Sequence, residues 1–168
     1  GDTPAEPLGT RRRRTMRAVA QLVTSASVEV EGTTVAAIDT GLLVLLGVHK
    51  SDVDSDVDYV ARKILGLRVF PDDDGRMNRS VVDVGGALLV VSQFTLYADT
   101  RKGRRPGFDA AAEPDRATAL YESFVARVAT TVPVHTGRFG AKMAVTCTNH
   151  GPVTIIVDSA DPSLQKEF

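Results

Sequence analysis

The sequence lacks several features that would assign the protein to a particular class. It has a single cysteine, Cys147, which excludes a disulfide within the chain and is typical of a reducing compartment. Because Cys147 lies in a strand-like run, we expect a small buried hydrophobic side chain there and not a nucleophile. The three histidines do not have the spacing of metal ligands, so the sequence predicts neither a metal site nor a cofactor.

Long hydrophobic segments are also absent. The longest apolar run, residues 42–48, has seven residues, whereas a membrane-spanning helix needs about 20. An apolar stretch nearer the N-terminus, residues 17–23, is interrupted by Arg17 and Gln21 and is too short and too polar for a signal peptide. We therefore expect a cytoplasmic protein that has no membrane contact.

Neither sign of charge is in excess. The 20 basic residues are offset by 21 acidic ones, so any binding of nucleic acid must come from local patches. One patch is the arginine run at residues 11–14, within a leader, residues 1–15, that has almost no apolar side chains and is predicted to be disordered. A solvated tail is the simplest interpretation of these arginines. Residues 16–168 are expected to form a single folded domain.

Hydrophobic periodicity predicts that the folded part begins with short strands joined by turns. Strands are expected at residues 16–23, 27–30, 35–38 and 42–48. Hairpin turns are expected at residues 31–34 and 39–41. This part of the chain should therefore form a meander.

Two helices are predicted farther along the chain. Within residues 53–67 apolar residues recur at spacings of three and four, and Ser51 or Asp52 can cap the helix. The second helix begins near Pro114, and its expected buried face consists of Ala117, Leu120, Tyr121, Phe124 and Val128. Together these elements predict an α+β domain in which a mostly antiparallel, barrel-like sheet packs against two main helices.

Two polar hexapeptides stand out against this background. The apolar run 87–91 leads into Ser-Gln-Phe-Thr-Leu-Tyr at residues 92–97, where alternation predicts a continuing strand with Ser92 and Phe94 on one face and Gln93 and Thr95 on the other. The second hexapeptide, Asn-His-Gly-Pro-Val-Thr at residues 149–154, is expected between two strands. Polar residues at a strand end are often only hydrogen-bonded structure.

The two hexapeptides in this order resemble the D-aminoacyl-tRNA deacylase family, and the likeness extends over residues 16–159. The resemblance implies an enzyme that hydrolyses the ester of D-aminoacyl-tRNA, and of glycine-mischarged tRNA, while it spares L-aminoacyl-tRNA. This activity is chiral proofreading in translation. The resemblance also implies a homodimer whose active site, at the subunit interface, receives the 3′ end of aminoacyl-tRNA.

The resemblance assigns roles to both hexapeptides. It implies a catalytic set formed by Ser92, Gln93, Phe94 and Thr95, and a chiral filter formed by Asn149, Gly151, Pro152, Val153 and Thr154. The Gly-Pro bond should be cis, and the dipeptide should reach into the partner subunit's pocket. There its carbonyls would hold the substrate's α-amino group, and an L side chain would collide with it, whereas glycine and D-residues would fit.

The common catalytic motifs are missing: the sequence has no Gly-x-Ser-x-Gly, no phosphate-binding P-loop and no His-Glu-x-x-His. A Ser/His/Asp triad that assembles only in space remains open. An aminoacyl ester is already activated, so backbone N–H groups near Phe94 and Thr95 that stabilise an oxyanion could suffice. Either the Thr95 hydroxyl attacks, for which no base is identifiable, or the 2′-hydroxyl of the terminal ribose assists water. The resemblance favours the second account.

Two further features bear on function. A basic loop follows the first hexapeptide, with cations at Arg101, Lys102, Arg104 and Arg105, and it is either merely solvated or contacts tRNA phosphates. Leu22 stands where the family usually has an arginine that helps to fix the Gly-Pro dipeptide, which keeps open a sister family with relaxed chirality. The remaining alternatives are a Thr- or Ser-dependent hydrolase of small esters or amides and a non-catalytic tRNA-binding module.

Overall fold

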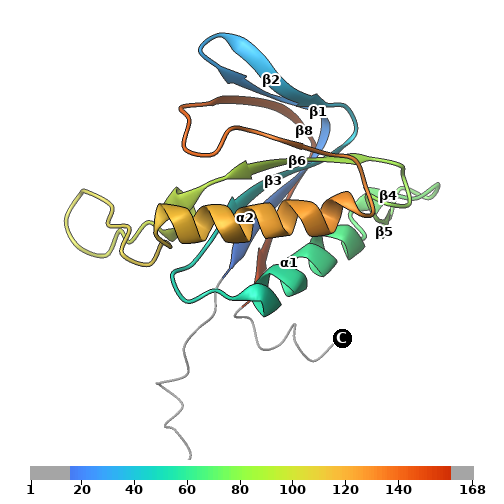
Figure 1. The fold of residues 1–168 in the computed structure, drawn as a ribbon. Helices are drawn as coiled ribbons and strands as arrows, with labels where there is room; N and C mark the ends of the chain where they lie inside the picture. Colours follow the sequence, from blue (N-terminus) through green and yellow to red (C-terminus); the bar gives the residue numbers. More distant parts are fainter. Residues whose placement is uncertain (1–15, 160–168) are drawn as a thin grey trace, which may run out of the picture.

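The computed structural model describes residues 16–159, so the predicted leader at residues 1–15 lies outside the described residues. Figure 1 shows a strongly curved sheet with two helices beside it. In chain order the elements are β1 (Arg17–Val30), β2 (Thr33–Ile38), β3 (Gly41–Gly47), α1 (Asp54–Gly66), β4 (Phe70–Pro71), β5 (Met77–Arg79), β6 (Ala87–Ser92), the 3-10 helix η1 (Phe94–Tyr97), α2 (Pro114–Ala129), β7 (Val134–Thr136) and β8 (Ala144–Asp158).

The main sheet is mixed, with strand order β2-β1-β3-β6-β7 and with β8 also paired to β1. β1 pairs antiparallel with both β2 and β3, and β2 and β3 are not paired with each other. The strands are antiparallel as expected, but the prediction of a meander, in which consecutive strands pair in turn, is wrong. From β3 onward α1 and then α2 connect strands that are parallel, β3 to β6 and β6 to β7. Parallel neighbours require such crossover connections. The helices therefore set the direction of β6, which places its C-terminal end beside the C-terminal end of β3.

β1 is the element around which the sheet is organised. The prediction of separate strands at residues 16–23 and 27–30 is wrong, since β1 runs unbroken over 14 residues. Thr24 and Ser25 interrupt the apolar pattern and are exposed, but the chain stays extended through them because β8 pairs along nearly the whole length of β1. Pairing with β8 resumes at Ser25, opposite Thr148, so a distant strand keeps β1 continuous where the local pattern predicts a break.

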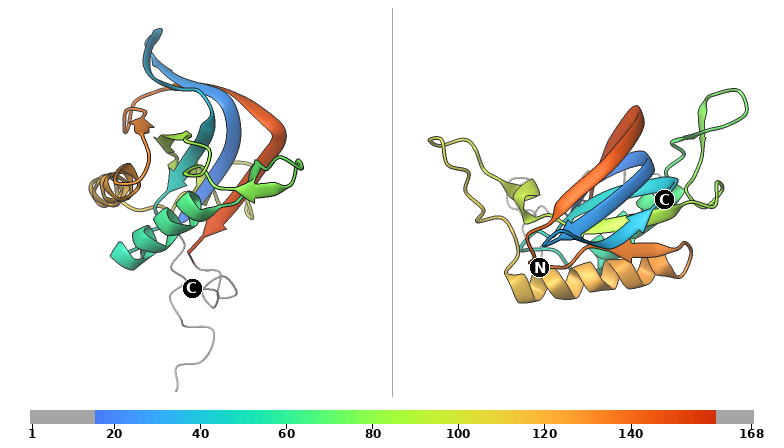
Figure 2. Two further views of the ribbon diagram at one scale, coloured as in Figure 1. Left: turned by 90° about the vertical axis from the view of Figure 1, so that its right-hand side faces the viewer. Right: turned by 90° about the horizontal axis from the view of Figure 1, so that it is seen from above.

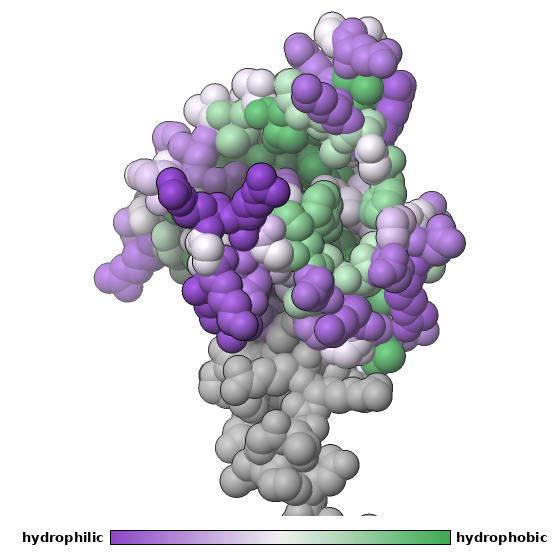
Figure 3. All heavy atoms as spheres, turned by 90° about the vertical axis from the view of Figure 1, so that its left-hand side faces the viewer, coloured by the Kyte–Doolittle hydropathy of each residue, from purple (hydrophilic) through white to green (hydrophobic). Residues whose placement is uncertain are grey.

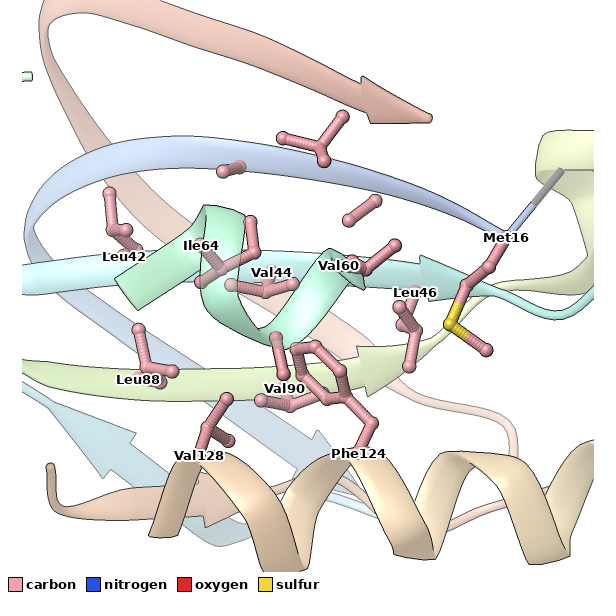
Figure 4. Packing of buried hydrophobic residues seen from close by; sticks show 14 of the residues in the cluster. Met16, Leu42, Val44, Leu46, Val60, Ile64, Leu88, Val90, Phe124 and Val128 are labelled. Atoms are coloured by element: carbon pink, nitrogen blue, oxygen red, sulfur yellow. The ribbon is translucent and has the colours of Figure 1, made fainter. Parts of the chain in front are cut away.

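One face of the sheet is covered by α1 and α2, which enclose the main core (Figure 4). The buried residues of α2 are the five that were predicted, and Phe124 is fully buried. In α1 the apolar stripe is buried through Val57, Val60 and Ile64. The mean stabilisation from burying one such side chain is about 1.5–3 kcal/mol, so these two faces account for the attachment of both helices.

The predicted cap of α1 is wrong. The N-cap residue is Val53, whose backbone N–H donates to the Asp56 carboxylate at 2.9 Å. The Asp52 carboxylate accepts instead from the backbone N–H of His49 at 2.7 Å. Asp52 therefore closes the turn between β3 and α1, and an acidic residue inside the first turn of α1 satisfies the end of the helix.

On the other face of the sheet a second, smaller core forms because the sheet folds over on itself. The β1–β2 hairpin curls until β2 contacts β6 and β7, with which it is not paired (Figure 2). Val28 and Ile38 from the hairpin are buried with Leu43 and Leu89 from β3 and β6. The prediction of an α+β domain with a barrel-like sheet is confirmed. None of the helices within residues 16–159 is long and apolar enough to cross a membrane.

Candidate active site

The first hexapeptide does not continue as a strand, so the predicted alternation of its side chains is wrong. β6 ends at Ser92, and the backbone N–H of Gln93 makes the final ladder bond to the Leu46 carbonyl at 2.8 Å. The chain then tightens into η1, in which Leu96 N–H donates to the Gln93 carbonyl at 3.3 Å and Ala98 N–H to the Thr95 carbonyl at 3.1 Å. A 3-10 turn spaces its side chains three to a turn, so no two-faced pattern remains.

The 3-10 helix is held by contact with the end of β3. The Tyr97 hydroxyl is buried and donates to the Gly47 carbonyl at 3.0 Å. Burial raises the pKa of Tyr97 well above its ordinary value, so the hydroxyl stays protonated and keeps donating. A Cβ on Gly47 would lie 2.8 Å from the Tyr97 ring and 3.2 Å from the Gln93 carbonyl oxygen. Gly47, which the sequence analysis did not single out, therefore makes room for η1.

The first turn of η1 presents donors at the surface. Within residues 16–159 no acceptor pairs with the backbone N–H of Phe94 or of Thr95, as expected for the first positions of a helix. The Gln93 side-chain amide donates to the Thr95 hydroxyl oxygen, and Phe94 is 57% exposed. Two adjacent amides beside a hydroxyl and an amide group are suited to binding a developing negative charge on oxygen.

The second hexapeptide lies inside one long strand and not between two strands, which corrects the prediction. β8 runs without a break, but its pairing with β1 shifts: Thr154 lies opposite Gln21 and Asn149 lies opposite Val23. Residues 150–153 therefore bulge out of the ladder opposite Leu22 alone. The Gly151–Pro152 peptide bond is cis, as the resemblance implies, and both residues are exposed.

The Asn149 side chain forms hydrogen bonds that hold this bulge in place. Its side-chain oxygen accepts from the backbone N–H of Val153 at 2.9 Å, and its side-chain nitrogen donates to the Thr154 hydroxyl at 3.0 Å. The Gln21 amide nitrogen lies 3.5 Å from the same hydroxyl. Leu22 has no such part in the bulge, because its side chain is 5% exposed and packs in the main core. The hydrogen bonds that fix the bulge therefore come from Asn149.

One protomer does not bring the two hexapeptides together. Ser92 is level with Leu46 of β3 and Ala18 of β1, whereas the bulge lies opposite Leu22, and β8 and β6 are separated by β1 and β3. Three strand spacings and four residues along a strand correspond to roughly 20 Å along the sheet. Within residues 16–159 of a single copy, the two hexapeptides therefore do not form one common pocket.

β8 is exposed along most of its length. Val145 is 40% exposed and Ile156 is 65% exposed. Cys147 is exposed as well, so the expectation of a buried cysteine is wrong. The strand at Cys147 was predicted correctly, but no element within residues 16–159 covers that part of it. Exposed apolar side chains that line one strand are a mark of an interaction surface.

The basic loop projects from the end of η1 (Figure 1). Asp99 and Gly107 close its base with two backbone hydrogen bonds of 2.7 and 2.9 Å. Arg101 is bound to the Asp99 carboxylate at 2.7 Å, and its hydrogen bonds lower the pKa of Asp99 to about 2. Lys102, Arg104 and Arg105 are exposed and have no ion pair within residues 16–159. Figure 3 shows hydrophilic side chains beside hydrophobic surface on the side toward which this loop projects.

The loop also meets the first hexapeptide directly. Phe108, at the far end of the loop, packs edge-on against Phe94, with ring centroids 5.1 Å apart. Aromatic pairs of this geometry are worth about 0.5–1.5 kcal/mol beyond burial. The contact sets the loop beside the amides of η1, and Phe108 is a second residue that the sequence analysis missed.

Comparison with known proteins gives a consistent result over most of the chain. The family model described as D-Tyr-tRNA(Tyr) deacylase matches residues 19–158. The chain is 58% identical over 147 residues to a D-aminoacyl-tRNA deacylase of Thermus aquaticus, a match that covers 87% of this chain and 97% of the relative. It is 57% identical over 154 residues to a D-aminoacyl-tRNA deacylase of Koribacter versatilis (strain Ellin345), covering 91% of this chain and 100% of the relative.

Solved structures give the same fold. The chain aligns with the c-Myc DNA Unwinding Element Binding Protein at a TM-score of 0.81 and 42% identity, covering 84% of this chain and 97% of that one. It aligns with a probable eukaryotic D-amino acid tRNA deacylase at a TM-score of 0.74 and 19% identity, covering 86% of this chain and 99% of that one. The second likeness is one of fold alone.

The geometry around Gly47 generates a prediction about stability. Gly47→Ala should destabilise the protein by about 1–3 kcal/mol, because the Tyr97 ring and the Gln93 carbonyl must move to admit the methyl group. Urea unfolding followed by circular dichroism measures this change. Gly66→Ala is the matched control, since nothing lies within 4 Å of a Cβ there. Equal midpoints for the two variants would show that η1 does not depend on Gly47.

Proposed function

This chain belongs to the D-aminoacyl-tRNA deacylase family, and on that premise we propose that it hydrolyses the ester bond of D-aminoacyl-tRNA and releases the D-amino acid and free tRNA. Such an activity removes D-amino acids before they reach the growing protein and belongs to the cytoplasm, where translation takes place. The observation that carries the proposal at the site is the pair of adjacent backbone N–H groups at Phe94 and Thr95, which are exposed and have no acceptor within the described residues.

We assign these two amides to the oxyanion. When water attacks the ester carbonyl carbon, the carbonyl oxygen gains negative charge, and donors already fixed in place stabilise that charge without reorganisation. Removal of one such donor typically costs about 100- to 1,000-fold in rate. The bond from the carbonyl carbon to the ribose 3′ oxygen then breaks, and the 3′ oxygen takes a proton to complete the free tRNA. Ser92 and Gln93 orient the ester and the terminal adenosine.

The proton of the attacking water goes to the substrate and not to Thr95. A hydroxyl nucleophile needs a base to activate it, and the group that contacts the Thr95 hydroxyl is the Gln93 amide, which donates to it. A hydroxyl oxygen that accepts a hydrogen bond from an amide has less electron density to offer. The 2′-hydroxyl of the terminal ribose lies next to the ester in the substrate itself, so it is the group placed to orient the water and relay its proton.

The complete site forms in a homodimer, in which the bulge of β8 enters the pocket of the partner subunit. Two features of the protomer support this arrangement: its two hexapeptides are roughly 20 Å apart along the sheet, and β8 is exposed. Ile156, Val19 and Leu45 lie level with one another on the helix-free face of the sheet and are at most partly covered. A second copy that covers this row would bury apolar surface and bring the bulge to η1.

Within the dimer the bulge selects substrates by shape. The carbonyls of Gly151 and Pro152 hold the α-amino group, and an L side chain collides with the main chain. The two hydrogen bonds of the Asn149 side chain hold this part of the backbone in place. Glycine has no side chain to collide and is therefore accepted. Lys102, Arg104 and Arg105 bind phosphates near the 3′ end of the tRNA, because they are exposed and unpaired within residues 16–159 and lie beside η1.

The first test compares substrates of different chirality. We expect the protein to release amino acid rapidly from D-aminoacyl-tRNA and glycyl-tRNA, and at least about 100-fold more slowly from the matched L-aminoacyl-tRNA, a difference of about 2.7 kcal/mol. Free amino acid is followed with tRNA labelled on the aminoacyl group. Equal rates for D and L would mean that the filter is relaxed, and salt-sensitive binding without release would identify a non-catalytic tRNA-binding module.

The second test separates the two accounts of attack. Replacing the terminal 2′-hydroxyl of the tRNA by hydrogen should lower the rate by at least about 100-fold, as loss of a general acid–base group does. Thr95→Ala should lower the rate by less than about tenfold, because its backbone N–H remains. Single-turnover deacylation measures both. A Thr95→Ala variant that is inactive, together with full activity on the 2′-deoxy substrate, would assign the attack to Thr95.

The third test concerns the dimer. The wild-type protein should sediment as a pair of 17.9 kDa chains. Ile156→Asp should shift the sedimentation toward the monomer and reduce deacylation, because it buries a charge in the proposed interface. Met77→Asp is a matched control, since Met77 is 60% exposed on β5, which belongs to a separate two-stranded sheet with β4. A monomeric wild-type protein that deacylates at full rate would contradict the shared site.

A further inference from the structure

Arg17, the first residue of β1, bonds to two other elements at once. Its guanidinium donates to the Leu96 carbonyl oxygen of η1 at 3.1 Å and makes two hydrogen bonds of 3.2 Å to the Asp158 carboxylate at the end of β8. Arg17 and Asp158 are register partners in the sheet, so they face the same side of it. The carboxylate therefore holds the planar guanidinium in the orientation that reaches Leu96.

The same guanidinium also lies over the residue that anchors η1. It is 5.5 Å from the centroid of the Tyr97 ring, and the ring of His49 packs edge-on against Tyr97 with centroids 5.6 Å apart. Tyr97 is thus contacted by Arg17 and by His49, and its hydroxyl bonds to Gly47. A cation over an aromatic face is attracted to the negative charge of that face, so the guanidinium helps to hold the Tyr97 ring in place.

The need for such support follows from the size of η1. A helix of four residues has very few hydrogen bonds of its own, and 3-10 geometry makes each of them poorer than in an α-helix. The carbonyl groups at its C-terminal end lack partners within the helix and carry partial negative charge. Of those carbonyls, Leu96 receives the charged donor, directly beside the turn whose first amides carry the proposed chemistry.

We propose that Arg17 is a positioning residue of the active site: it bridges the end of β8 to the C-terminal end of η1 and so fixes the direction of the Phe94 and Thr95 N–H groups. This inference rests on the proposed function for its catalytic consequence. Arg17 itself is bonded within the protein through all three of its guanidinium nitrogens, so it acts through η1 and not on the substrate.

The experiment replaces Arg17 by methionine, which keeps the aliphatic stem. We expect amide hydrogen exchange at Leu96 and Ala98 to become about tenfold faster, because a hydrogen bond from a charged donor is lost next to them. The kcat for D-aminoacyl-tRNA should fall by about tenfold or more with KM changed less than about twofold, since a misdirected oxyanion donor weakens the transition state and not tRNA binding. A purely structural role would not produce that split.

Arg127→Met is the matched control. Arg127 also pairs with an aspartate, Asp58, and its side chain is 34% exposed against 36% for Arg17. It lies on α2, away from η1, so both exchange at η1 and kcat should stay at the wild-type level. Arg17→Lys keeps the charge but not the planar fork, and it should give an intermediate loss of about threefold. It also serves if Arg17→Met does not fold.

The outcomes are separable. Exchange at Leu96 and Ala98 that stays at the wild-type rate in the Arg17 variants would overturn the proposal, and so would a kcat equal to that of Arg127→Met. If the wild-type protein releases no amino acid from D-aminoacyl-tRNA, the proposed function fails, but the exchange measurement still decides whether Arg17 holds η1.

Discussion

The hydrogen bond from the Tyr97 hydroxyl to the Gly47 carbonyl, made possible by the missing Cβ on Gly47, is the contact on which the candidate site depends. This bond holds η1 against the end of β3 directly after β6 ends, so the chain forms a 3-10 turn there and does not continue β6. A strand in that position would pair its N–H groups with a neighbour. The turn leaves those of Phe94 and Thr95, both exposed residues, without an acceptor among the described residues.

A site of this kind explains how hydrolysis can be proposed without an acid–base residue. The ester of an aminoacyl-tRNA is a reactive bond with its own hydroxyl neighbour, so the protein has to orient it and stabilise charge on one oxygen. The Gln93 amide donates to the Thr95 hydroxyl, and the backbone N–H groups of Phe94 and Thr95 remain as donors for the carbonyl oxygen of the ester. What such a site requires is a fixed backbone, which the contacts of Tyr97 and Arg17 supply.

Sequence reasoning succeeded where one local pattern determines the outcome. The buried face of α2 follows from the 3.6-residue period, and β2 and β3 follow from apolar runs bounded by turn residues. It failed where distant residues decide. Residues 92–97 alone do not indicate that the missing side chain of Gly47 leaves space for the Tyr97 ring. Residues 149–154 alone do not indicate that β8 continues to pair with β1 on both sides of a bulge. The exposure of Cys147 could not be predicted for the same reason. Alternation along a strand shows which residues share a face, but it does not show whether another element covers that face.

The geometry of the sheet makes the argument for a second copy independent of sequence likeness. Both hexapeptides begin in the one sheet, but β1 and β3 lie between them, and a strand cannot cross its neighbours without losing its ladder. No movement that keeps the sheet intact could bring the bulge of β8 to η1 within one protomer. The proposed dimer would remove this obstacle, because a symmetric interface could bring each copy's bulge to the other copy's η1 without breaking either sheet. In that proposed dimer, exclusion of L side chains by the main chain would require a stable interface, and exposed apolar residues such as Ile156 are suited to forming one.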